Sequence, residues 1–262
     1  MNFRVAALVA VGLVASQLSF ATHAFADPAF DLWTQGKYDE AIKTGLAENN
    51  AEGLSVAARA AASDMTMRTK PCLECTTRTE ELARKALAAD PKAALPTIYL
   101  AGALGYRGRI IGMMASQSAK LGEQSKAAIE AALAAHPKDA QLLATMGGWH
   151  FEVVRVGGSM LARWTYGAST DKGLEKFAEA LKIAPNDLVV NYLYGISLAS
   201  VDADEYRDKI EAAWKRVAAA PAESAYEQAQ KKRAAELLAL LGGKDRKAFD
   251  AKLKTYMGIP QS

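Results

Sequence analysis

The sequence predicts an all-α fold: a right-handed superhelix of stacked helical hairpins, two of which are enlarged. Half of the 262 residues are apolar, enough for one extended core, and Ala is very frequent while Val, Ile and Thr rarely cluster. The motif Ala-Leu-x-x-x-Pro ends at Pro91, Pro137 and Pro185, and in a weaker form at Pro221. A recurring helix-ending motif in a helix-forming composition indicates a helical repeat.

Each copy of the motif is expected to end one helix and precede the next. Proline stops a helix because it has no N–H to donate and clashes with the preceding turn. A small residue follows each proline by ten positions, at Ala101, Gly147 and Gly195, where two helices would approach closely. Asp139 and Asp187 are placed to cap the helices that follow. These features are typical of tetratricopeptide-like hairpins.

The spacing of the prolines predicts where the repeats are enlarged. The intervals are 46 residues to Pro137, 48 to Pro185 and 36 to Pro221, against about 34 for a tetratricopeptide unit. The extra residues fall at 106–116 and 153–167, and such insertions often gather on the binding face. Residues 80–90 are expected to be helical, and 224–241 to form a capping helix with Lys231, Lys232 and Arg233 pointing outward.

Residues 1–26 have the pattern of a secretory signal peptide. A short basic start precedes a mostly apolar stretch, and Ala24-Phe25-Ala26 fits a cleavage site. An uncleaved membrane anchor is the alternative, but the apolar stretch is shorter than the roughly 20 residues of a membrane-spanning helix. We therefore expect a periplasmic protein with one helical-repeat domain over 27–262 and no stable membrane span after cleavage.

The two cysteines, Cys72 and Cys75, lie three positions apart. In an oxidising compartment they can close a small loop as a structural disulfide. A redox site would favour a βαβ setting, and a zinc site would need about four ligands, so both alternatives rank lower. We expect no metal and no cofactor.

Arginines and aromatic residues gather in and beside the two insertions, a composition typical of interaction surfaces. If both insertions line one concavity, they would suit a partner or an amphipathic anion; otherwise they only pack the longer helices together. Met113, Met114 and Met160 are interpreted as core residues. For His150, a contact between helices ranks above a polar contact in a ligand groove. The candidate residues are Tyr106, Arg107, Arg109, Trp149, His150, Arg155, Arg163, Trp164 and Tyr166.

The segment from Pro137 to Pro185 resembles the helical domain of the regulator of microtubule dynamics family. The matching residues are Pro137-Lys-Asp-Ala, Met146-Gly-x-Trp149, Gly173-Leu-Glu-Lys-Phe177 and Ala184-Pro185. The resemblance implies a non-enzymatic helical scaffold, and some family members are implicated in tethering and in holding lipids. The export signal and the cysteine pair depart from the family, so microtubules are not expected partners.

No reactive constellation stands out, and the net charge of +3 is spread over interleaved acids and bases. An enzyme and a nucleic-acid-binding protein are therefore both disfavoured. The sequence predicts a scaffold for another envelope protein or peptide. The alternative is a carrier or receptor subunit that binds a lipid-like anion beside an envelope transport system.

Overall fold

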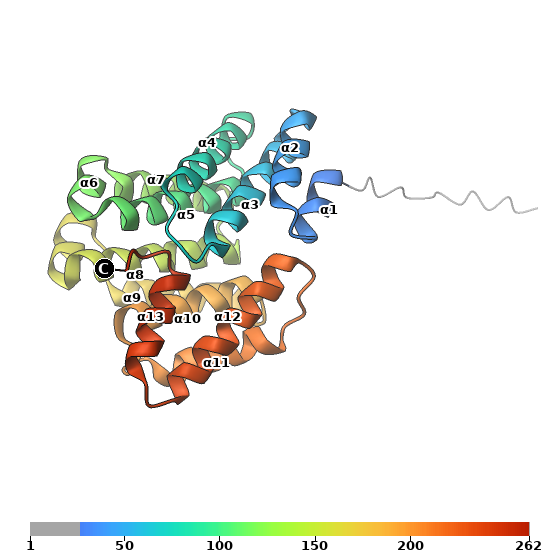
Figure 1. Cartoon of the computed structure of the whole chain (residues 1–262). Coiled ribbons are helices and arrows are strands. Elements are labelled where there is room, and N and C mark those ends of the chain that lie inside the picture. Colours follow the sequence, from blue (N-terminus) through green and yellow to red (C-terminus); the bar gives the residue numbers. More distant parts are fainter. Residues whose placement is uncertain (1–26, 262) are drawn as a thin grey trace, which may run out of the picture.

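The computed structural model describes residues 27–261, and this part of the chain is all-α, as predicted (Figure 1). It contains thirteen α-helices, one π-helical turn and, within those residues, no β-strand. The proposed signal peptide, residues 1–26, lies outside the described residues. No helix in the described part of the chain is both long and apolar enough to span a bilayer.

The helices pair into six hairpins, with one extra element in each of the two enlarged ones. The hairpins are α1–α2, α3–α4, α5–α7, α8–α9, α10–α11 and α12–α13, with α6 and η1 as the extra elements. Their bounds are α1 (Pro28–Thr34), α2 (Tyr38–Glu48), α3 (Ala51–Met67), α4 (Leu73–Ala89), α5 (Ala94–Ile111), α6 (Met113–Ser118), α7 (Leu121–Ala135), α8 (Ala140–Leu161), η1 (Ala162–Tyr166), α9 (Thr170–Ile183), α10 (Leu188–Asp202), α11 (Arg207–Ala219), α12 (Ala225–Gly242) and α13 (Arg246–Tyr256).

Both predicted aspartate caps are confirmed. Asp139 Oδ1 accepts from the backbone N–H groups of Gln141 and Leu142, each at 2.9 Å, at the start of α8. Asp187 Oδ1 accepts from Val190 N at 2.8 Å at the start of α10. A side-chain oxygen at this position satisfies N–H groups that have no partner within the helix.

Close packing at the predicted small residues is also confirmed. A Cβ at Gly195 would lie 2.2 Å from Nε1 of the buried Trp214, and a Cβ at Gly147 would lie 2.7 Å from the ring of Phe177. No side chain fits at these distances. In the hairpins α8–α9 and α10–α11, the backbone of the first helix therefore packs directly against an aromatic ring of the second, and glycine is required at these two positions.

Two sequence expectations were wrong. Helix α4 begins at Leu73 and not near Glu80, because Cys72 caps it with a sulfur that accepts from Cys75 N at 3.1 Å. Arg233 does not point outward from α12. It is buried, and its guanidinium donates to the carbonyls of Thr66 and Met67 at 2.7 Å each. Those carbonyls end α3, where the last turn of a helix leaves carbonyl oxygens free to accept.

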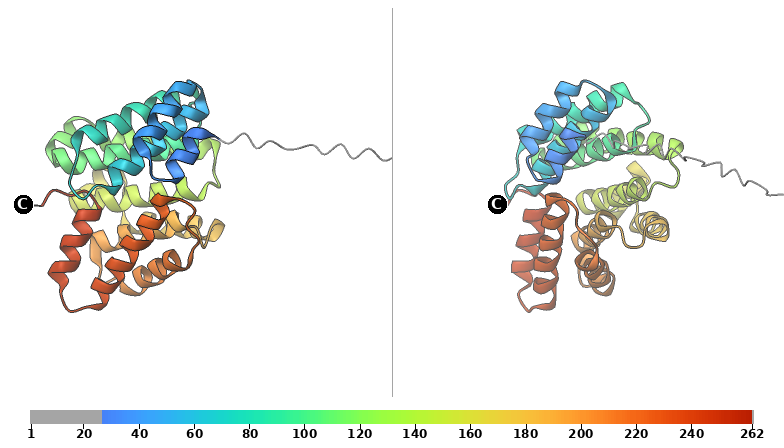
Figure 2. Two further views of the ribbon diagram at one scale, coloured as in Figure 1. Left: turned by 45° about the vertical axis from the view of Figure 1, so that its right-hand side comes forward. Right: turned by 90° about the vertical axis from the view of Figure 1, so that its right-hand side faces the viewer.

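The last hairpin returns to the first half of the chain. Besides Arg233, the Tyr106 hydroxyl donates to Tyr256 O at 3.2 Å, and Arg109 Nη1 donates to Met257 O at 2.7 Å. These bonds tie α12 and the end of α13 to α3 and α5, and Figure 2 shows the red hairpin meeting the blue and teal helices. The superhelix is therefore closed into a ring.

Candidate functional site

A cavity of about 430 Å³ lies inside this ring. Its walls come from the first helix of every hairpin (α1, α3, α5, α8, α10 and α12), with further residues from α6, α7, η1 and the end of α13. Helices α2, α4, α9 and α11 contribute none of its lining residues. The cavity thus occupies the concave side of the superhelix, which the closing hairpin covers.

Most of the wall is apolar or aromatic. Aliphatic side chains come from both halves of the chain, and tyrosine is the recurrent aromatic residue. The apolar part includes Ile98, Leu104, Leu121, Ile129, Leu161, Leu193 and Ile196, and the aromatic part includes Trp33, Tyr99, Tyr106, Trp149, Tyr166, Tyr192, Tyr226 and Tyr256. Such walls bury hydrocarbon while the tyrosine hydroxyls provide scattered polar contacts.

Two arginines bring positive charge to the cavity without a carboxylate partner among residues 27–261. Arg59 donates from Nε to the Tyr99 hydroxyl at 2.8 Å, and its guanidinium lies 4.7 Å from the ring centre of Trp33. Arg233 is bound to backbone carbonyls and stacks on Tyr256 at 4.5 Å. Neither charge is neutralised by an acidic side chain within ion-pair distance in this part of the chain.

A third arginine of the cavity, Arg109, is neutralised. Its Nε and Nη2 donate to the two oxygens of Glu152 at 2.8 and 3.1 Å, and Arg155 donates to the same carboxylate at 2.6 and 3.0 Å. Burial alone would raise the pKa of Glu152, but the charge of Arg109 and the bonds and charge of Arg155 outweigh it and lower the pKa to about 2. The triad therefore stays ionised and joins α5 to α8.

Two buried polar atoms of the cavity wall have no hydrogen-bond partner among residues 27–261. They are the Tyr192 hydroxyl of α10 and Oε1 of Gln230 of α12. Burial raises the pKa of Tyr192, and the adjacent Arg233 guanidinium opposes that rise by its charge and its contact with the hydroxyl, although no hydrogen bond of normal geometry joins the two side chains. Buried polar atoms are nearly always paired in proteins, so these two are available to water or to a polar group of a bound molecule.

Four of the predicted residues line the cavity: Tyr106 and Arg109 from α5, Trp149 from α8 and Tyr166 from η1. Trp149 donates from Nε1 to Gly122 O at 3.0 Å, and its ring meets that of Tyr166 edge to face at 6.5 Å. The structure therefore brings both insertions to one concavity.

The other five predicted residues do not line it. Arg107 forms an ion pair with Glu80 at 3.0 Å, and Arg155 forms one with Glu152. His150 is buried beside Trp149, with 5.1 Å between the ring centres, and burial, followed by the charges of Lys172, Lys126 and Lys176, lowers its pKa to about 4. Arg163 and Trp164 are exposed on η1.

Sequence reasoning missed the polar residues of the cavity that come from other hairpins, namely Arg59, Tyr192, Gln230 and Arg233. Arg233 follows Lys231 and Lys232, a charge run typical of a solvated helix face, and Tyr192 lies in an apolar run. Arg233 lies four positions before the apolar Leu237, on the same side of α12, and this spacing was a signal that sequence reasoning could have used.

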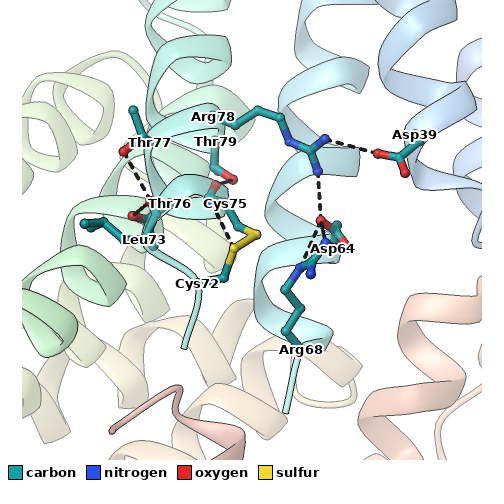
Figure 3. Close-up of a disulfide and its surroundings, with 10 residues drawn as sticks. All are labelled: Asp39, Asp64, Arg68, Cys72, Leu73, Cys75, Thr76, Thr77, Arg78 and Thr79. Carbon is teal, nitrogen blue, oxygen red and sulfur yellow. Dashed lines mark hydrogen bonds and ion pairs between the residues drawn. A yellow bond between two sulfur atoms is a disulfide. The ribbon is translucent and has the colours of Figure 1, made fainter. Parts of the chain in front are cut away.

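Cys72 and Cys75 form a disulfide at the start of α4, and neither lines the cavity. Figure 3 shows that Arg78, one turn further on, bridges Asp39 of α2 at 3.1 Å and Asp64 of α3 at 2.8 Å. The two cysteines themselves pack with Met65 of α3 and with Ala103 and Tyr106 of α5, so the disulfide lies where α4 meets α3 and α5. Among the described residues, no group of three or more His, Cys, Asp or Glu side chains could hold a metal ion.

The comparison with protein families identifies the same architecture. The model of the family described as regulator of microtubule dynamics protein 1-3 matches residues 29–242, from α1 to the end of α12. No curated protein matched the chain significantly. The match covers most of the chain and the first helix of every hairpin, though not α13, so the chain belongs to the regulator of microtubule dynamics family, a family of helical, tetratricopeptide-like interaction domains.

Proposed function

We propose that the protein is a non-enzymatic binding protein of the periplasm whose cavity holds an amphipathic anion with an aliphatic tail, such as a fatty acid. One observation supports this best. A largely apolar cavity contains two arginines without a carboxylate partner in residues 27–261 and two unpaired buried polar atoms. An apolar tail matches the wall, and a carboxylate matches the arginines and the tyrosine hydroxyl.

The polar groups proposed to hold the head group lie near one another, since the charge of Arg233 acts on both Tyr192 and Tyr226. Arg233, Tyr192 and Gln230 come from the closing half of the chain, and Tyr226 of α12 adds a further hydroxyl to the wall. A carboxylate beside them would accept from the Tyr192 hydroxyl. The volume of about 430 Å³ is within the usual range for small-molecule sites.

A peptide in the concave groove, the usual mode of a helical scaffold, fits this ring less well. The last hairpin covers the groove through the bonds of Arg233 and Arg109 to backbone carbonyls. Membership of a helical interaction family supports a protein partner as a second candidate function. Such a partner, an envelope protein of a transport system, would contact the outer surface, and the protein would act as its receptor subunit.

The periplasmic location rests on residues 1–26, and the Cys72–Cys75 disulfide suits an oxidising compartment. N-terminal sequencing of the exported protein should find a chain that begins at Asp27. A full-length chain that starts at Met1 and stays with the membrane fraction would contradict export by a cleaved signal.

Two substitutions test the cavity as the ligand site. Gly105 lines it, and a Cβ there meets nothing within 4 Å, so Gly105→Leu should fill space without a clash. Tyr192→Phe removes only the unpaired hydroxyl. Both should weaken the binding of a fluorescent fatty acid by about tenfold, because one loses apolar space and the other a hydrogen bond to a charged group.

The matched controls are Gly242→Leu, where a Cβ also meets nothing within 4 Å, and Tyr194→Phe, two positions from Tyr192 but outside the cavity. Both controls should bind the fatty acid as the wild type does. Mass spectrometry of the extracted protein should find a lipid-like anion in the wild type and less in Gly105→Leu. Equal binding by all five proteins would refute the proposed site.

A further inference from the structure

The two enlarged hairpins each end in a short exposed element beside the cavity. After Gly112, helix α6 (Met113–Ser118) forms what we call the first lip. After Gly158, the final residues of α8 and η1 (residues 159–166) form the second lip. Both glycines leave the helical conformation in the same way, with φ and ψ of 84° and 166° at Gly112 and 72° and 161° at Gly158. Only glycine adopts this backbone readily, so the two breaks are specific features.

The lips are equivalent positions of the repeat. Gly112 follows Pro91 by the same number of residues as Gly158 follows Pro137, and a methionine stands two positions after each glycine. Those methionines, expected from the sequence to be core residues, are 82% exposed at Met114 and 78% exposed at Met160. Trp164 of the second lip is 83% exposed. This placement leaves much apolar surface in water at one end of the molecule.

Both lips also reach the cavity. Met113 and Gln117 of the first lip and Leu161 and Tyr166 of the second line its wall. Tyr166 connects the second lip to the start of α7, since a Cβ at Gly122 would lie 3.3 Å from its ring. The lips that carry the exposed apolar groups therefore also form part of the cavity wall, and a chain that left the cavity between the lips would meet those groups.

The charge of the lips favours a bilayer as the occupant of this surface. The first lip contains no charged residue, and the second contains only Arg163, next to Trp164. Tryptophan beside a basic residue at an apolar tip is typical of segments that enter the interfacial layer of a membrane. Continuity with an apolar cavity adds a second reason. An aliphatic chain could pass from the bilayer into the cavity without exposure to water.

We infer that the two lips are a membrane-docking surface that places Met114, Met160 and Trp164 in the interfacial layer of a lipid bilayer. The transfer of an aliphatic chain from the bilayer into the cavity rests on the proposed function. Docking of the lips on the bilayer does not, and it can be measured without a cavity ligand. A second copy of this chain or another protein is the competing occupant, and the test separates them.

Vesicles of an equal mixture of phosphatidylethanolamine and phosphatidylglycerol provide the probe. A chain that begins at Asp27 is used, because the apolar stretch of residues 1–26 could bind vesicles by itself. Trp214 is buried, but Trp33 and Trp149 line the cavity, so the response of Trp164 is measured as the difference between the wild type and Trp164→Phe. We expect a blue shift, quenching by brominated acyl chains, and no such response in Trp164→Phe.

Flotation with vesicles then tests the whole surface. The triple variant Met114→Ser, Met160→Ser and Trp164→Ser should float at least about tenfold less than the wild type, since it loses most of the inserted apolar area. A matched triple variant places serine at three exposed apolar residues of other helices: Leu46, Leu73 and Ile183. It should float as the wild type does. Both variants should keep their melting temperatures, because every changed side chain is exposed.

Three results would overturn the inference. They are a wild type that does not bind vesicles, a lip variant that binds them equally well, and a wild-type dimer that the lip substitutions dissociate. Failure of the proposed function looks different. If the wild type and Gly105→Leu float equally but neither binds the fluorescent fatty acid, docking stands and the cavity ligand does not. Conversely, the lip variant should still bind the fatty acid in the absence of vesicles.

Discussion

Replacing Glu152 by Gln should destabilise the protein strongly at neutral pH. The carboxylate holds Arg109 and Arg155 through four hydrogen bonds and lies where the ring joins α5 to α8. The glutamine side chain would be neutral, so the buried Arg109 would lose its counter-charge. Removing one partner of a buried ion pair costs about 3–5 kcal/mol.

The pKa of Glu152 gives a second magnitude. The pKa falls from an ordinary 4.5 to about 2 in the folded protein, and each unit is worth about 1.4 kcal/mol, so ionisation of Glu152 contributes about 3 kcal/mol of stability. Because the folded pKa is depressed, this contribution is complete above pH 4.5 and is lost as the pH falls towards 2. The advantage of the wild type over Glu152→Gln should therefore shrink across that window.

Urea unfolding of both proteins at several pH values between 2 and 7 measures this difference. In the difference between the two free energies of unfolding, the contributions of all groups that titrate equally in both proteins cancel. Glu80→Gln is the matched control, because Glu80 also binds two arginines, Arg84 and Arg107, but both are more exposed. It should cost about 1 kcal/mol. A loss at Glu152 no larger than at Glu80, or one that does not change with pH, would refute this reasoning.

Three further perturbations follow from the packing. Gly195→Ala should destabilise the protein by about 2 kcal/mol despite the better helix propensity of Ala, because the new Cβ would overlap the buried Trp214 indole. Gly105→Ala should instead stabilise it by about 0.5–1 kcal/mol, since a Cβ there meets nothing within 4 Å and only the gain in helix propensity remains. Thermal unfolding of the two variants measures the difference. The double variant Cys72→Ser and Cys75→Ala keeps a side-chain oxygen that can cap α4 but removes the disulfide. Urea unfolding should show a free energy of unfolding about 2 kcal/mol lower than that of the wild type. An unchanged free energy would argue against a structural role of the disulfide. His150 is neutral when buried, because its pKa is lowered from 6.5 to about 4. The free energy of unfolding of the wild type should therefore fall by about 3 kcal/mol as the pH falls from 6.5 to 4, and that of His150→Gln should lack this loss. An NMR titration of the folded protein that gave His150 a pKa near 6.5 would contradict this prediction.

Local chemistry explains why so much of the fold could be predicted. Asp139 and Asp187 cap helices through atoms two or three residues away, and the close approach at Gly147 and Gly195 involves the adjacent helix of the same hairpin. Repetition made these local signals visible. The enlarged hairpins could be located because two of the intervals between the prolines are longer than the known length of a tetratricopeptide repeat.

The sequence alone thus determined the helices, their pairing into hairpins and the position of two insertions, since each depends on neighbours close along the chain. Only the tertiary structure decided that the array closes into a ring. That closure depends on bonds such as Arg233 to Thr66 O, whose partners are 167 residues apart. Closure of the ring buries Arg233, which the sequence suggested to be solvated, and brings residues from every hairpin into one cavity wall. The structure also leaves Met114 and Met160 in water, because each follows a glycine at which the chain departs from the helix that packs in the core.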